Sequence, residues 1–127
     1  MKTLFAIAAG GALGATLRYL VVHLGLRLFG PGFPYGVLAV NVAGSFLMGV
    51  IVAALAAGFE LSAPLRAFLT VGCLGGFTTF SSFSLDAVTL WERGEGGLAL
   101  AYVLGSVILS ILGLAAGLAL VRSLAAP

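Results

Sequence analysis

The distribution of charge limits this chain to a membrane-spanning fold. Only ten of its 127 residues are charged, and they leave long uncharged stretches between them. Three stretches, 28–59, 67–85 and 96–121, contain 32, 19 and 26 residues. A membrane helix needs about 20 mostly apolar residues, so each stretch is long enough for one crossing. The N-terminal segment is also apolar, although Arg18 interrupts it. The sequence therefore predicts four transmembrane helices.

The composition excludes an ordinary soluble protein. The chain is 61% hydrophobic and 8% charged, whereas a soluble domain carries about a quarter charged residues. The net charge of +2 comes without any basic cluster, which argues against a nucleic-acid partner. Cys73 is the single cysteine, so an internal disulfide and a cysteine metal site are both excluded. Membrane lipid is the expected surrounding.

We expect one transmembrane domain, 1–127, with helices at approximately 3–28, 35–58, 64–92 and 96–123. A proline- and glycine-rich turn occupies 30–34, and a polar, glycine-rich loop occupies 92–97. Ser62 precedes Pro64 as a helix cap precedes a first-turn proline. The first residues also resemble a cleavable signal peptide. Apolar character continues to Leu28, however, which favours a first membrane helix.

The chain contains 19 glycines, about twice the usual share. Many fall at the small-xxx-small spacing that lets helices approach closely in lipid, which predicts tight helix packing. These pairs are Gly10 with Gly14, Ser45 with Gly49, Gly72 with Gly76, and Gly113 with Gly117.

The positive charges give almost no preference for one orientation in the membrane. Four spans would place Lys2, Arg66 and Arg122 on one side. Arg27 and Arg93 would lie on the other, together with Arg18 if its side chain reaches the interface. Such a small bias permits insertion in both orientations, and two copies could then form an antiparallel dimer.

The third span carries an unusual polar segment. Five hydroxyl residues fall within seven positions (78, 79, 81, 82 and 84), directly after Gly75 and Gly76. Glycine weakens a helix, and a broken helix with free carbonyls is a common way for membrane proteins to hold a cation. The alternative is an intact helix whose hydroxyl groups bond back to their own backbone. We favour a third helix broken in the middle of its span.

Polar and aromatic residues in the other spans suit an anion. The amide of Asn41 can donate a hydrogen bond, although it could equally serve as a link between helices. Phe80 and Phe83 share a helix face, and aromatic ring edges are electropositive. Ser106 and Ser110 form a pair of donors four residues apart, if they are not simply small packing residues.

No catalytic machinery is visible. The chain lacks the phosphate-loop, zinc-protease and nucleophile-elbow motifs, and no histidine or lysine adjoins the hydroxyl cluster as a base. Arg18 and Asp86 are the ionisable residues expected to meet the membrane, and a structural role is favoured for both. A lone His23 is not a metal site. We conclude that the protein is not an enzyme.

Three segments resemble the signatures of the Fluc/CrcB family of fluoride channels. Residues 75–84, GGFTTFSSFS, are similar to its third-helix motif G-G-x-T-T-F-S-[ST]-F-S. Residues 41–49, NVAGSFLMG, are similar to its second-helix motif, and 11–19 look like its first helix. Val37 departs from the family, because many members carry threonine at this position.

The resemblance implies a fluoride-selective channel that exports fluoride passively across the cytoplasmic membrane and lowers its toxicity. It implies an antiparallel dual-topology homodimer with a structural sodium ion at its centre, held by backbone carbonyls of Gly75 and Thr78. The implied fluoride path is Asn41, Phe80, Phe83, Ser106 and Ser110. Supporting residues would be Arg18, Thr79, Ser81 and Asp86.

Two other classes compete with this interpretation. A coupled exporter of the small multidrug type should carry a glutamate in the first membrane helix, where this chain has Arg18. A helper subunit that only packs against partners would leave the Gly-Gly/Thr-Thr segment and Asn41 unexplained. Passive movement is also favoured because no paired membrane carboxylates are present for proton coupling.

Overall fold

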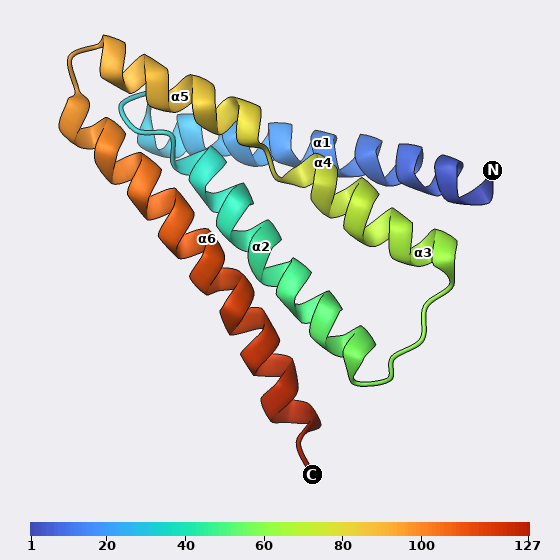
Figure 1. Ribbon diagram of the computed structural model, residues 1–127. Coiled ribbons are helices and arrows are strands. Elements are labelled where there is room, and N and C mark those ends of the chain that lie inside the picture. Colours follow the sequence, from blue (N-terminus) through green and yellow to red (C-terminus); the bar gives the residue numbers. More distant parts are fainter.

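The computed structural model describes residues 1–127, and all of its regular elements are helices (Figure 1). The first, second and fourth spans are α1 (Lys2–Phe29), α2 (Tyr35–Ala56) and α6 (Gly96–Ala125). The third, Ala63–Glu92, comprises α3 (Ala63–Ala67), the π-helical η1 (Phe68–Leu74), α4 (Gly75–Phe77) and α5 (Phe80–Glu92). These four spans are long and apolar enough to cross a membrane, as the sequence predicts.

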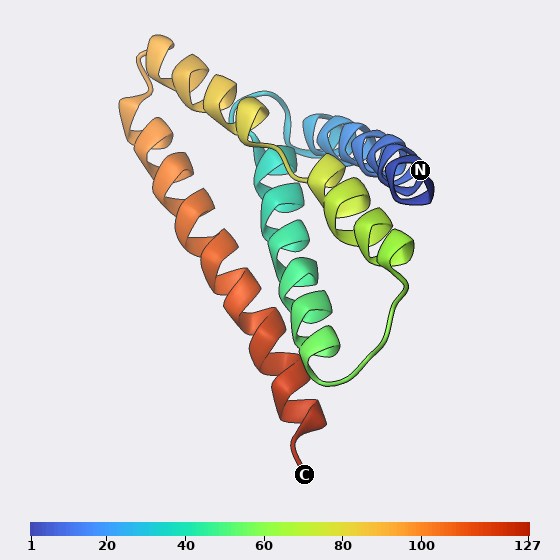
Figure 2. The ribbon, with the colours of Figure 1, turned by 45° about the vertical axis from the view of Figure 1, so that its right-hand side comes forward.

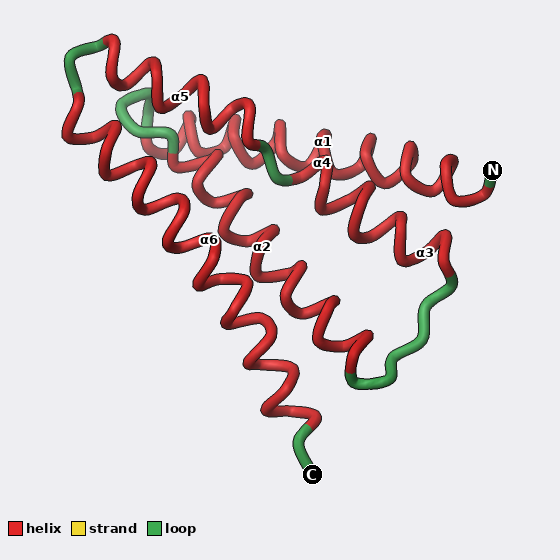
Figure 3. The backbone as a smooth tube through the Cα atoms, viewed as in Figure 1, coloured by secondary structure: helices red, strands yellow, loops and turns green.

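Local chemistry explains where the helices start and stop. The hydroxyl of Ser62 accepts a hydrogen bond from the Leu65 amide at 3.3 Å, which caps the third span. The second helix ends at Ala56, two residues before the expected 58. Gly58 has a φ of 107°, which a right-handed helix cannot contain. Figure 3 shows the short loops between the four spans.

The first and third spans touch through glycine. A Cβ atom added to Gly72 would lie 2.8 Å from the Cα of Gly10, and one added to Gly76 would lie 2.8 Å from the Gly11 carbonyl oxygen. A Cβ on Gly14 would collide with the Cys73 carbonyl. The expected tight packing is therefore confirmed here, because only the absence of side chains lets these two backbones approach so closely.

The fourth span lies along α2 and also packs on α5 (Figures 1 and 2). Glycine again mediates the contact with α2, since a Cβ on Gly49 or Gly117 would collide with the opposing backbone. A small buried cluster forms where α2, α5 and α6 meet, and it consists of Val37, Phe83, Leu90, Ala99 and Tyr102. Most large apolar side chains elsewhere point outward, as a lipid-facing surface requires.

Candidate functional site

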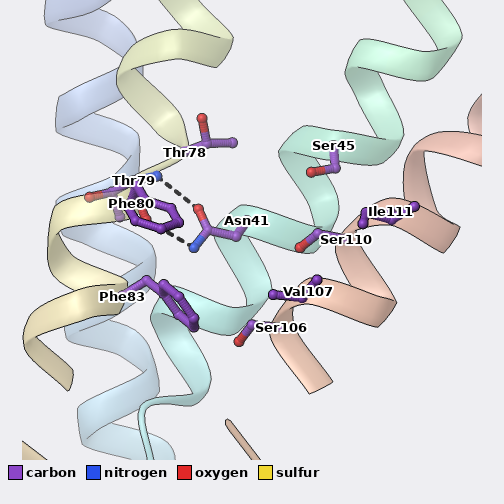
Figure 4. A pocket seen from close by; sticks show the side chains of 10 residues that line it. All are labelled: Asn41, Ser45, Thr78, Thr79, Phe80, Phe83, Ser106, Val107, Ser110 and Ile111. Atoms are coloured by element: carbon purple, nitrogen blue, oxygen red, sulfur yellow. Dashed lines mark hydrogen bonds between the residues drawn. The ribbon is translucent and has the colours of Figure 1, made fainter. Parts of the chain in front are cut away.

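A pocket of about 330 Å³ opens between the second, third and fourth spans (Figure 4). The five residues expected along an anion path all line it. Thr78 and Thr79 lie at one edge, and Ser45, Val107 and Ile111 complete the wall. The structure thus brings together side chains that are up to 70 positions apart in the sequence, 41 to 111.

The backbone of Thr78 and Thr79 is extended between α4 and α5. Their φ and ψ angles are −82° and 156° for Thr78, and −152° and 122° for Thr79. In a continuous helix the Thr79 amide would donate to the Gly75 carbonyl. It donates instead to Oδ1 of Asn41 at 2.8 Å. The Gly75 carbonyl therefore loses its usual intrahelical donor.

Asn41 joins α2 to this extended segment through both ends of its amide. While Oδ1 accepts from the Thr79 amide, Nδ2 donates to the Thr79 carbonyl at 3.1 Å, as the dashed lines in Figure 4 show. The amide nitrogen carries two hydrogens, so one N–H remains for another acceptor. Asn41 can therefore link two helices and still donate to a ligand, although the sequence presents these roles as alternatives.

Several hydroxyl groups of the third span are satisfied locally. Oγ1 of Thr78 donates to the Leu74 carbonyl at 2.8 Å, and Oγ of Ser84 donates to the Phe80 carbonyl at 2.9 Å. Oγ1 of Thr79 caps α5 by accepting from the Ser82 amide at 3.1 Å. Back-bonding, the alternative interpretation of this segment, is therefore correct for Thr78 and Ser84. Their hydroxyl hydrogens are not free for a ligand.

The serine pair on α6 behaves differently. Ser106 is 5% exposed, and its hydroxyl has no hydrogen-bond partner although it lines the pocket. Ser110 lies one helical turn further along the same wall. A buried hydroxyl without a partner costs free energy, about 1–3 kcal/mol. An occupant of the pocket that accepts a hydrogen bond would remove this cost.

The two phenylalanines differ sharply in burial. Their ring centroids are 5.5 Å apart, but Phe80 is 79% exposed whereas Phe83 is 9% exposed. Tyr102 of α6 packs behind Phe83 with a centroid distance of 5.2 Å, and its hydroxyl donates to Oδ2 of Asp86 at 3.2 Å. Sequence reasoning missed Tyr102. Its spacing of four residues before Ser106 was the available signal, because it places both on one helix face.

Four of the expected site residues lie outside the pocket lining: Gly75, Ser81, Arg18 and Asp86. Nη1 of Arg18 approaches the Thr78 carbonyl oxygen at 3.4 Å from α1. Oγ of Ser81 lies 3.4 Å from Oγ1 of Thr79. Gly75 is exposed, and a Cβ built on it would meet only the Thr70 carbonyl, at 3.7 Å. Arg18, Ser81 and Gly75 thus lie beside the extended segment, whereas Asp86 lies further along α5 and binds Tyr102.

Comparison with known proteins agrees with the motifs in the sequence. The family described as "CrcB-like protein, Camphor Resistance (CrcB)" matches residues 5–118. A fluoride-specific ion channel FluC from Cereibacter sphaeroides is 60% identical over 122 residues, which cover 96% of each chain. FluC proteins from Agrobacterium fabrum and Chelativorans sp. are 55% and 56% identical, and at least 93% of every chain is covered. These names describe a channel and not an enzyme.

Proposed function

Because the chain belongs to the CrcB-like protein family, we propose that it is a fluoride-selective channel. It would let fluoride leave the cell passively across the cytoplasmic membrane and so reduce fluoride toxicity in the cytoplasm. Relatives named as fluoride-specific ion channels match this chain over nearly its whole length, which supports the proposal. The observation that carries it is the buried, unpartnered hydroxyl of Ser106 in a pocket that also holds the spare N–H of Asn41.

Fluoride is small and strongly hydrated, so a pore must replace its water with other hydrogen-bond donors. Ser106, Ser110 and the free N–H of Asn41 supply such donors along one wall of the pocket. Phe80 and Phe83 supply electropositive ring edges on the opposite wall (Figure 4). Chloride is larger and a weaker hydrogen-bond acceptor, so it gains less than fluoride does from the same donors.

The proposal includes a sodium ion held by backbone carbonyls of Gly75 and Thr78. Sodium prefers oxygen ligands, and interrupted membrane helices present such carbonyls. Both groups fit this role, because Gly75 has lost its intrahelical donor and Thr78 is extended. When bound, the ion would supply fixed positive charge beside the anion path. Nη1 of Arg18 also approaches the Thr78 carbonyl oxygen, at 3.4 Å.

Two carbonyls are too few for a cation, which is one reason to propose an antiparallel homodimer. A second copy would bring the number of carbonyls from two to four. Two apolar residues at the pocket rim, Phe80 and Ile111, are also exposed in the single chain, and a second copy could cover them. The uncovered position of Gly75 and the near-equal division of positive charge between the two membrane sides support the same arrangement.

Liposomes test the function directly. Purified protein is reconstituted into vesicles loaded with potassium fluoride or potassium chloride, and valinomycin is added to carry the countercharge. We expect rapid fluoride release without chloride release. Asn41→Ala and Phe80→Ile should slow release, whereas Phe59→Ile, which changes a similarly exposed aromatic outside the pocket, should not. A folded dimer that releases neither anion would favour a helper subunit or a coupled exporter.

A further inference from the structure

We propose that Phe33, in the loop between α1 and α2, is a positioning residue of the fluoride path. It acts through Tyr102 on the ring of Phe83. This inference rests on the proposed channel function and adds to it a residue from outside the pocket. Phe33 does not line the pocket, so any effect on conduction must be transmitted through its neighbours.

Three aromatic contacts connect the loop to the pocket. The Phe33 and Tyr102 rings meet at 87° with centroids 5.5 Å apart, an edge-on arrangement. Tyr102 then contacts Phe83 at 5.2 Å, and Phe83 contacts Phe80 at 5.5 Å. Tyr102 is 0% exposed, so its neighbours, Phe33 among them, cover it completely.

Hydrogen bonds hold the loop and Tyr102, the first two members of this contact chain, in place. The Tyr102 hydroxyl is held by Asp86, while the loop is held by Nη1 of Arg93, which donates to the Pro31 carbonyl at 3.2 Å. Prolines at 31 and 34 restrict the backbone on either side of Phe33. The loop therefore presents the Phe33 ring to Tyr102 as part of a rigid wall rather than as a mobile cover.

Only one of the two pocket phenylalanines depends on this wall. Phe83 is buried against Tyr102, whereas Phe80 is largely exposed and contacts only Phe83 among the aromatic rings. Replacing the rigid Phe33 ring with a smaller or more flexible side chain would leave its place beside Tyr102 open or loosely filled. Tyr102 and Phe83 would then relax toward it, and the Phe83 ring edge would turn away from the ion.

The test is a set of double mutants measured by fluoride release from liposomes. Phe33→Leu should slow release about tenfold in the otherwise unchanged protein, because small displacements of a binding group are costly. In a Phe83→Ile background it should change the rate less than about twofold, since the residue it positions is gone. In a Phe80→Ile background the tenfold effect should persist.

Controls separate positioning from general stability. Phe59→Leu removes a largely exposed ring that lies outside the pocket, and it should leave release unchanged. Phe33→Tyr keeps the ring and should restore the rate. Phe33→Met, of similar volume but without a ring, repeats the cycle if Phe33→Leu does not fold.

Three results would overturn the inference. They are an unchanged rate in Phe33→Leu or Phe33→Met, an equal effect of the Phe33 variant with and without Phe83, and an effect lost in both the Phe80 and Phe83 backgrounds. A wild-type protein that releases no fluoride would instead refute the proposed channel function.

Discussion

The two parts of the third span pack against their neighbours through different kinds of contact. Residues 63–77 lie against α1 through bare backbone, with glycine on both sides of the contact. Residues 80–92 pack on α6 through side chains, chiefly Phe83 against Tyr102. The first part has no room for a chemical group at its interface. The second presents its phenylalanines to the pocket. One part fixes the position of the backbone, and the other supplies the site.

The extended residues Thr78 and Thr79 connect these parts, and Asn41 holds them in place. If this division is correct, variants of the first part should lose folded protein. Variants of the second part should lose ion release while the fold survives. The following changes test the comparison, beginning with the largest expected effect on folding.

Gly14→Ala should be the most damaging to the fold. Its Cβ would collide with the Cys73 carbonyl and would lie 2.9 Å from the Phe77 backbone nitrogen, so α1 and the third span must separate. Overpacking against backbone costs about 3 kcal/mol or more. Thermal unfolding in detergent should show a much lower midpoint. Gly11→Ala on the same helix, where nothing lies within 4 Å, is the control. Equal losses in both variants would contradict the steric argument.

Asn41→Ala should reduce both the stability of the fold and the rate of ion release. It leaves the Thr79 amide and carbonyl without partners, which should lower the free energy of unfolding by about 2 kcal/mol. Fluoride release should also slow more than about tenfold, because a donor is lost and the extended segment is loosened. Ser45→Ala, one turn along α2, removes a pocket hydroxyl but not this link, and its unfolding midpoint should not change. A comparable loss of stability in Ser45→Ala would refute the special role of Asn41.

Ser106→Ala should have the smallest effect on the fold and a clear effect on conduction. Because its buried hydroxyl has no partner, removing it should leave stability unchanged or raise it by up to about 1 kcal/mol. Loss of one hydrogen bond to fluoride should slow release about fivefold. Ser123→Ala, whose hydroxyl donates to the Leu120 carbonyl near the C-terminus, should change neither quantity. A marked loss of stability in Ser106→Ala would mean that the hydroxyl serves the fold.

The four spans were predictable because charge cannot be placed in lipid cheaply, so the uncharged stretches mark them directly. Ser62 was also predictable, since a cap acts on its own neighbours. The second helix was expected to run to 58, because hydrophobicity does not reveal that Gly58 adopts a positive φ. The helix cap could thus be predicted from local sequence, whereas the backbone conformation of Gly58 could not.

Part of the pocket lining was predictable from the sequence, but the bonds within it were not. Asn41 and Ser106 were chosen because a polar group is costly in a membrane, and both line the pocket. The bonds from Asn41 to Thr79 join residues 38 positions apart, and no local pattern encodes them. Tyr102 passed unnoticed because its importance comes from Phe33, Phe83 and Asp86, which only the fold brings together.

The π-helical segment Phe68–Leu74 sets the rotational phase of everything that follows it. The Gly75 amide bonds to the Thr70 carbonyl, five residues back, so the segment holds more residues per turn than an α-helix. Each residue of an α-helix turns the chain by about 100°. Winding the same seven residues as an ordinary α-helix would turn the chain further and rotate Thr78 and Thr79 away from Asn41. The wider winding thus accommodates one extra residue before Thr78, so the winding of this segment matters as well as its composition.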